Sequence, residues 1–373
     1  MRILNFKDPL LMPNSTKKPT LTLLLISFLF AGCASLDSAQ QCNDKGYESS
    51  IEETLSACRE AALKGDTDAQ LIIGDIYLSG DAGGVNQDAE EAIIWYEMAA
   101  KQGVMEAKYK LGIMYKDGIG IAKHLLLAHV QFVTAALQGH AEAQFTLGKM
   151  HANGEGTPKN DIQAFRWYSM AAKQGYAEAQ VCLASIYILG KSVHKDNKQA
   201  LHWFTLAAEQ GHPKGQLGVG EMNHYGKGGV PKSTGRAILW YTLSAKQGDT
   251  EAQFRLGNMH LTGDGSPKDA KLAFHWYTLA AKKGHATAQY NLGVLYAYGT
   301  GVTKDHKEAY AWLGSAGIRN RIDQFTHTSP TTENINKMIT KLKKSLAEDM
   351  TPNEIKQAEK LAFTYLRKYK PGG

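Results

Sequence analysis

The chain lacks the short motifs that mark common enzymes and metal sites. Its 373 residues contain no H-E-x-x-H motif and no C-x-x-C pair. Ser192 and Lys195 fit S-x-x-K, but no S-D-N or K-T-G motif accompanies them. His151 and His260 occupy a position that holds tyrosine in the parallel segments described below, which indicates packing rather than metal binding. We therefore expect no catalytic residue, no metal and no cofactor.

Long hydrophobic runs are scarce, and the one near the start, Leu21–Ala31, is too short to span a bilayer as a mature helix. Lys17 and Lys18 precede this run, and small residues follow it, as in a secretory signal peptide. The Ala-Gly-Cys sequence that ends at Cys33 resembles a bacterial lipobox, which implies cleavage before Cys33 and lipidation of its thiol. The same resemblance implies sorting to the outer membrane. Translation could start at Met1 or Met12, and a non-lipidated secretory signal remains the alternative.

An excess of charge of one sign is also absent. The formal net charge is +6, and the first 32 residues contribute +3 of it, from four basic residues and one acidic residue. The segment 318–373 carries 11 Lys and Arg against 6 Asp and Glu, or +5, so the middle of the chain is near −2. No sustained basic stripe is present, which argues against binding to nucleic acid.

Cysteine is sparse, with four residues in the chain. Cys42 and Cys58 lie 16 residues apart, and export to an oxidising compartment would permit a disulfide between them, which we predict. Cys182 lies in an apolar helical segment, and we expect it to be a buried, inert thiol.

What the sequence does have is a repeated pattern. All six tryptophans occupy the same position in segments such as AFRWYSMAAKQG (164–175) and AFHWYTLAAKKG (273–284): Trp95, Trp167, Trp203, Trp240, Trp276 and Trp312. A chain that places every tryptophan in register is built from stacked copies of one unit.

A second segment alternates with the first, as in AQFTLGKMHANG (143–154). Its copies start at residues 69, 107, 143, 179, 215, 252 and 288. Both segments have the apolar spacing of a 3.6-residue helix and end at glycine in nearly every copy. We call the glycine-centred helix A and the tryptophan-bearing helix B. Three residues separate each B from the next A, so these neighbours must be antiparallel.

The pattern A-x-x-x-L-G-x-x-Y-x-x-G followed by A-x-x-W-Y-x-x-A-A-x-x-G resembles the Sel-1-like repeat family, a relative of tetratricopeptide repeats. The resemblance covers residues 69–320 and implies an all-α, right-handed α/α superhelical solenoid of seven helix pairs. The second copy departs from the pattern, with Gln131 in place of tryptophan after an apolar run at Leu125–Leu127.

Two packing expectations follow. A mid-helix glycine costs about 1 kcal/mol of helix propensity. Its recurrence in helix A, for example as Gly148, therefore implies close approach of a bulky neighbour. The tryptophans are expected to be buried between successive helix pairs, because one pair cannot bury two apolar faces alone.

The domain organisation follows from these patterns. We predict a lipoprotein signal peptide at 1–32, a tether at 33–47, an N-terminal capping helix at 48–65, seven repeats at 69–320 and capping helices at 321–373. Within the last segment we expect a loop at 318–330 and helices at 332–346 and 352–368. Thr351, Pro352 and Glu354 combine a capping box with proline in the first turn.

The resemblance implies that the A helices line a concave face whose variable positions choose a ligand. We consider the seventh position of the helix A segment the strongest candidate for binding, followed by the tenth. The candidate binding residues at these positions are Asp75, Lys116, Lys149, Glu221, His224 and Asn258, and the aromatic groove residue Tyr298 is a further candidate.

The mixture of acidic, basic and apolar types at these positions favours a protein or peptide partner over a small molecule. The leading hypothesis is a lipid-anchored, monomeric interaction scaffold of the bacterial cell envelope, facing the periplasm or the cell surface. The alternatives are a secreted or surface factor that contacts a host, a polysaccharide-export scaffold in which Tyr298 contacts sugar, and, least favoured, a peptidoglycan or β-lactam hydrolase acting through Ser192.

Overall fold

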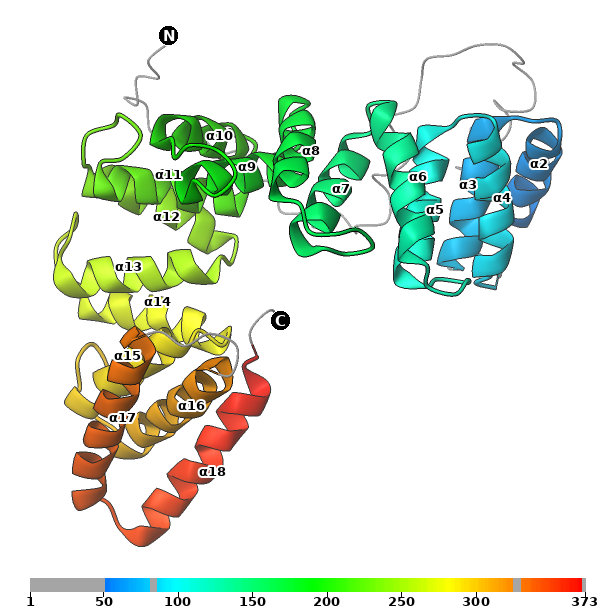
Figure 1. Ribbon diagram of the computed structural model, residues 1–373. Helices are drawn as coiled ribbons and strands as arrows, with labels where there is room; N and C mark the ends of the chain where they lie inside the picture. Colours follow the sequence, from blue (N-terminus) through cyan, green and yellow to red (C-terminus); the bar gives the residue numbers. More distant parts are fainter. Residues whose placement is uncertain (1–50, 81–85, 325–329, 371–373) are drawn as a thin grey trace.

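The computed structural model describes residues 51–80, 86–324 and 330–370. Within them the protein is built from helices joined by short loops, and the helix pairs are stacked side by side along a curved path (Figure 1). The all-α solenoid predicted from the repeats is confirmed.

The A and B helices alternate as predicted, and each is thirteen residues long except for the last B helix. The A helices are α3 (Thr67–Ser79), α5 (Met105–Asp117), α7 (Ala141–Asn153), α9 (Ala177–Leu189), α11 (Pro213–Tyr225), α13 (Thr250–Thr262) and α15 (Ala286–Tyr298). The B helices are α4 (Ala89–Lys101), α6 (Leu125–Leu137), α8 (Asp161–Lys173), α10 (Asn197–Glu209), α12 (Thr234–Lys246), α14 (Ala270–Lys282) and α16 (His306–Gln324). We number the pairs as repeats 1 to 7.

Local signals explain the helix boundaries. Helix α8 begins after Asn160, whose side chain accepts hydrogen bonds from the next free backbone amides. Helix α7 ends at Gly154, which adopts φ 73°, a left-handed conformation that other residues reach only with strain.

The mid-helix glycine, present in every A helix except α9, which has Ala184, has the packing role that its cost implied. A Cβ placed on Gly148 would lie 2.5 Å from the ring of Tyr168, and one on Gly257 would lie 2.5 Å from Tyr277. Both tyrosines are buried. The aromatic residue that follows the tryptophan, rather than the tryptophan itself, is therefore the bulky neighbour.

The tryptophans lie between successive repeats, as expected, but their burial is uneven. Trp95 and Trp312, in the first and last repeats, are 3% and 4% exposed. Trp167, Trp203 and Trp276 are only partly buried and pack against clusters formed by the preceding B helix and their own A helix. The indoles therefore lie between successive repeats as predicted, but in the inner repeats they are less buried than expected.

Repeat 2 differs from the other repeats at the positions where its sequence departs from the repeat pattern. Helix α6 contains no acidic or basic residue, apart from a histidine, and Leu126, Val130 and Leu137 are exposed on it. Gln131 is partly buried in the position of the missing indole, and Phe132 fills the core beneath it.

A row of buried glutamines links the repeats in a way that the sequence analysis missed. Gln144, the second residue of the helix A segment that starts at residue 143, donates to the carbonyl of Ala136 in α6 (3.0 Å). It accepts from Gln174 at the end of α8 (2.7 Å). Equivalent glutamine pairs are Gln70 with Gln102, Gln180 with Gln210 and Gln216 with Gln247. Recurrence of Gln at both positions was the available signal.

The row is interrupted in repeat 6. Lys283 replaces the second glutamine there and donates to the carbonyl of Gly248 (2.7 Å). The buried Oε1 atom of Gln253 consequently has no hydrogen-bond partner among the described residues. A single Gln-to-Lys difference thus removes one link of the row.

The two ends are closed by additional helices. Helix α2 (Ile51–Leu63) packs on repeat 1, and α17 (Pro330–Glu348) and α18 (Pro352–Lys368) pack on α16. The stretch expected as a loop from 318 is helical to Gln324, so α16 crosses the predicted domain boundary at 320. Buried Arg319 and Asn320 stand where most other B segments end in Gln-Gly, and Arg319 donates to the carbonyls of Leu366 and Tyr369. The helix therefore continues because its last turn is part of the cap.

Helix α18 begins with the predicted capping box, since Thr351 and Glu354 exchange hydrogen bonds. Its Tyr365 stacks on Trp312 with ring centroids 4.2 Å apart. The cap covers the exposed side of the last repeat in this way.

The predicted signal peptide, Cys33 and Cys42 lie outside the described residues. Cys58 is buried and takes part in a disulfide. Its pairing with Cys42 stays a prediction. Cys182 is a free thiol that is only partly buried, less than expected, and burial raises its pKa.

Candidate binding surface

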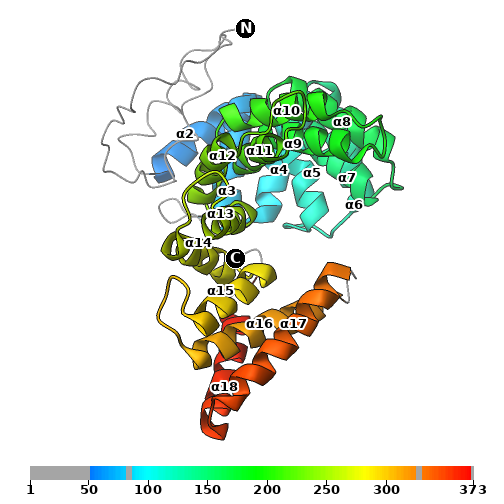
Figure 2. The same cartoon turned by 90° about the vertical axis from the view of Figure 1, so that its left-hand side faces the viewer.

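The A helices form the inner side of the curve. In Figure 2 the A helices α9, α11 and α13 lie inside the arc, with the B helices α8, α10 and α12 outside it. Helix α9 also contacts α11 directly, although they belong to different repeats. Side chains on the exposed stripe of the A helices therefore meet along one continuous face, which we call the A-helix face.

Positions are counted from the start of each helix A segment, so position 1 is residue 143 in α7 and residue 179 in α9. Positions 4, 7 and 11 make up this stripe, because residues at i, i+3 and i+7 share one side of a helix. The seventh position was predicted from the sequence. The eleventh carries the most exposed large side chains, Leu189, Tyr225 and Tyr298. The tenth position turns toward the core instead, since Leu78, Ile188 and Leu261 pack in hydrophobic clusters.

Three seventh-position residues bond to the fourth-position residue of the following A helix. Asp75 pairs with Lys110 (2.9 Å), Glu221 pairs with Arg255 (3.3 Å), and Asn258 accepts from Asn291 (3.5 Å). The fourth-position partners were missed by the sequence analysis, although the i, i+3 relation to the seventh position was visible.

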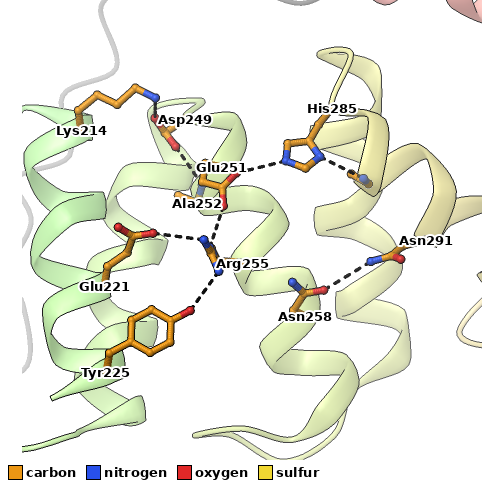
Figure 3. A network of polar contacts seen from close by, with 11 residues as sticks. Lys214, Glu221, Tyr225, Asp249, Glu251, Ala252, Arg255, Asn258, His285 and Asn291 are labelled. Atoms are coloured by element: carbon orange, nitrogen blue, oxygen red, sulfur yellow. Dashed lines mark hydrogen bonds and ion pairs between the residues drawn. The ribbon is translucent and has the colours of Figure 1, made fainter. Parts of the chain in front are cut away.

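A network of charged and polar groups surrounds Arg255 in repeats 5 and 6 (Figure 3). Its guanidinium lies between Glu221 and Glu251, with Nε 2.8 Å from Glu251, and donates to the hydroxyl of Tyr225 (3.3 Å). Burial raises the pKa of Glu221, and the hydrogen bond from His285 is the main cause that lowers the pKa of Glu251. The two carboxylates therefore share one cation in unequal surroundings.

His285 couples this network to the next repeat. Its Nδ1 atom accepts from the backbone amide of Ala288 at the start of α15 (3.1 Å), so the proton resides on Nε2, which donates to Glu251 (3.2 Å). The imidazole also stacks on Phe254 with centroids 4.5 Å apart. One side chain thus caps a helix and bonds to the preceding repeat.

The same arrangement recurs in repeats 1 to 3. Lys110 lies between Asp75 and Glu106, and Glu106 accepts from His140 (2.8 Å). His140 caps α7 through Ala143. The hydrogen bond from His140 is again the main cause that lowers the pKa of the carboxylate. The A-helix face therefore has two matching acid–base networks, one near each end.

The remaining candidate residues have other surroundings. Lys116 pairs with its neighbour Asp117 (3.0 Å), and His224 lies 3.5 Å from Asp264. Tyr298 is 68% exposed at the eleventh position. Lys149 is exposed and has no carboxylate within 4 Å among the described residues; its ammonium lies 5.7 Å from the centre of the Phe145 ring. The structure therefore does not gather the seven candidates into one pocket but distributes them along the face.

Chemistry-bearing groups elsewhere are isolated. Ser192 lies in the loop between α9 and α10. His260 bonds to Ser266, and His151 meets His129 edge-on with centroids 5.4 Å apart. In the part of the chain that the structure describes, no three metal-ligating side chains come together, and no helix is both long and apolar enough to cross a bilayer.

Two of the surface hollows in the described part can be compared with a catalytic cleft, and neither resembles one. One, of about 530 Å³, is lined by Arg321, Glu333, Asn336, Lys337, Thr340, Lys341 and Lys344. The other, of about 500 Å³, lies beside Trp203 and Gln210 on the tryptophan-bearing side. Neither brings a nucleophile and a base together.

The sequence model of the Sel1 repeat family matches residues 67–104, 106–126, 141–176, 177–212, 213–249, 250–285 and 286–318. These ranges cover more than half of the chain. The chain belongs to the Sel1 repeat family. The second match stops at residue 126, just inside α6, where the charge-free helix of repeat 2 departs from the pattern.

Two solved structures are similar over most of the chain. A Sel1 repeat protein from Oxalobacter formigenes is 34% identical, with a TM-score of 0.61 over 78% of this chain and 81% of that one. A protective antigen with an SLR fold, present in uropathogenic Escherichia coli strains, is 30% identical, with a TM-score of 0.58 over 88% of this chain and 75% of that one.

A more distant relative shares only a short stretch. Chitin synthase regulatory factor 3 of Schizosaccharomyces pombe is 35% identical over 66 residues, which is 18% of this chain. The chain spans 7% of that protein's length.

Proposed function

We propose that this protein is a lipid-anchored scaffold of the bacterial cell envelope that binds a protein or peptide along the A-helix face. The observation that carries this proposal is the continuity of that face. Successive A helices present exposed side chains of mixed chemistry at positions 4, 7 and 11. Sel1 repeats generally mediate protein–protein interaction, and the solved relatives support the same repeat architecture.

The face suits an extended segment of a partner better than a small ligand. A small-molecule site surrounds most of its ligand with a concave wall. The A-helix face instead runs across several repeats, with groups as different as Lys149, Leu189 and Tyr225 on it. Affinity for an extended partner can build up from several such contacts.

The envelope location rests on the amino-terminal sequence. The basic residues, the apolar run and Cys33 after Ala-Gly support export and lipidation. Metabolic labelling with an alkyne fatty acid should modify the wild-type chain and leave Cys33→Ala unlabelled and unprocessed. Labelling of Cys33→Ala at the wild-type level would contradict the anchor.

Crosslinking in native cells tests the interaction itself. A photo-crosslinking amino acid at position 149 on α7 should trap an envelope protein, while the same amino acid at position 198 on α10 should not. Equal trapping at both positions, or none at either, would contradict binding on the A-helix face.

A further inference from the structure

The two acid–base networks leave the middle of the A-helix face different from its ends. In repeats 1–3 and 5–7 the cations Lys110 and Arg255 each lie between two carboxylates. These charges compensate one another within the protein. A partner would have to break existing ion pairs to bind them.

Among the described residues, repeats 3 and 4 have no cation held between two carboxylates on the A-helix face. Lys149 has the seventh position on α7, where Asp75 and Glu221 stand in the networks. The fourth position of the next A helix is Cys182, in place of Lys110 or Arg255. The charge of Lys149 acts on this thiol and partly offsets the burial that raises its pKa. A neutral thiol cannot form an ion pair with Lys149, so the ammonium remains available.

The exposed stripe of α9 beside Lys149 is uncharged. Its fourth, seventh and eleventh positions are Cys182, Ser185 and Leu189, and Leu189 is 63% exposed. The hydroxyl of Ser185 is already used, because it donates to the carbonyl of Val181 (2.9 Å). This part of the face therefore offers apolar contact next to a single unpaired cation.

Nearby acidic residues do not neutralise Lys149. Glu142 and Glu178 are exposed in the first turns of α7 and α9, where a negative charge is stabilised by the helix dipole. Neither lies within 4 Å of Lys149. These carboxylates have a structural reason to be where they are, whereas the ammonium of Lys149 has the Phe145 ring beneath it but no carboxylate partner among the described residues.

We propose that repeats 3 and 4 are the specificity-determining part of the face and that they bind a peptide segment in which a carboxylate is flanked by apolar side chains. The carboxylate pairs with Lys149, and an apolar side chain packs on Leu189. This inference rests on the proposed function, because it names the chemistry of the partner that the A-helix face binds.

A peptide selection tests the inference. A phage library of random linear peptides is selected against the mature chain and then measured as synthetic peptides by fluorescence anisotropy. The enriched peptides should share an Asp or Glu, or a terminal carboxylate, beside apolar residues. Their affinity should fall at least tenfold for Lys149→Glu and severalfold for Leu189→Ser.

Lys198→Glu on α10 is the matched control, because it makes the same change of charge at another exposed lysine and should leave affinity unchanged. A peptide whose acidic residue is changed to lysine should bind Lys149→Glu better than wild type. Circular dichroism of each variant should show unchanged helix content, which separates loss of binding from loss of fold.

The outcomes distinguish the two proposals. Peptides that bind equally to wild type and Lys149→Glu would overturn this inference while supporting peptide binding elsewhere on the protein. Enrichment of basic peptides would also overturn it. Failure of every selected peptide to bind would count against both the inference and the proposed function.

Discussion

Repeats 3–4 and repeats 5–6 share one core but present different surfaces. A Cβ placed on Gly148 or on Gly257 would lie 2.5 Å from the ring of a buried tyrosine. On the A-helix face, however, Arg255 is held by two carboxylates, while Lys149 has none within 4 Å in the described part. The comparison shows that burial fixes the core in every copy, whereas the exposed positions are free to serve either cohesion between repeats or contact with a partner.

The largest effect is expected in the shared core. Gly148→Ala and Gly257→Ala should each destabilise the protein by about 1–3 kcal/mol, because the new methyl group overlaps a packed tyrosine ring. Urea unfolding followed by circular dichroism measures the change. Gly235→Ala on α12 is the control, since a Cβ there meets nothing within 4 Å and should leave stability unchanged or slightly higher. A marked inequality between the two core variants would break the comparison.

The next largest effect concerns the exposed cations, whose contributions to stability should differ between the two regions. Arg255→Met leaves Glu221 and Glu251 facing each other without a cation and should cost about 1–2 kcal/mol, discounted for partial exposure. Lys149→Met removes no ion pair and should change stability by less than about 0.5 kcal/mol. The same urea titration compares them, and equal costs would mean that Lys149 has a structural partner after all.

The glutamine row predicts a gain of stability. Lys283→Gln supplies the donor that Gln253 lacks, and it can still reach the carbonyl of Gly248, as Gln247 reaches Gly211. We expect stabilisation of about 0.5–1 kcal/mol, measured as a higher thermal midpoint. Lys282→Gln, one residue earlier, is the control and should have no such effect. A lower midpoint for Lys283→Gln would show that the lysine bond outweighs the missing link.

The smallest effect concerns pH. The pKa of Glu251 is lowered in the folded protein, so its stabilisation is present at neutral pH and is lost as the pH falls below the ordinary carboxyl pKa. The pKa of Glu221 is raised by burial, and its protonation opposes that loss in part. Glu251→Gln should therefore lose less stability than wild type between pH 7 and pH 4, by about 0.5 kcal/mol. Thermal midpoints across this range measure it, and an identical slope would contradict the assignment.

The repeats, their helices and the antiparallel pairing could be predicted from the sequence because each depends on periodicity. The role of the A-helix glycine followed from its cost, although the sequence did not identify its neighbour as Tyr168. The capping box at Thr351 was visible because it is local.

Contacts between repeats were harder to predict. The seventh position was identified, but Arg255 and Lys110 were missed, because pairing across A helices depends on how one repeat rotates against the next. The extension of α16 to Gln324 was missed as well, since it depends on Arg319 reaching carbonyls nearly fifty residues away.

The stacking of Trp312 against Tyr365 and Tyr369 sets where the array stops. Helices α17 and α18 together cover the last B helix, so a further repeat could stack on α16 only by displacing this cap. A repeat inserted between two existing repeats would leave the aromatic stack at Trp312 intact.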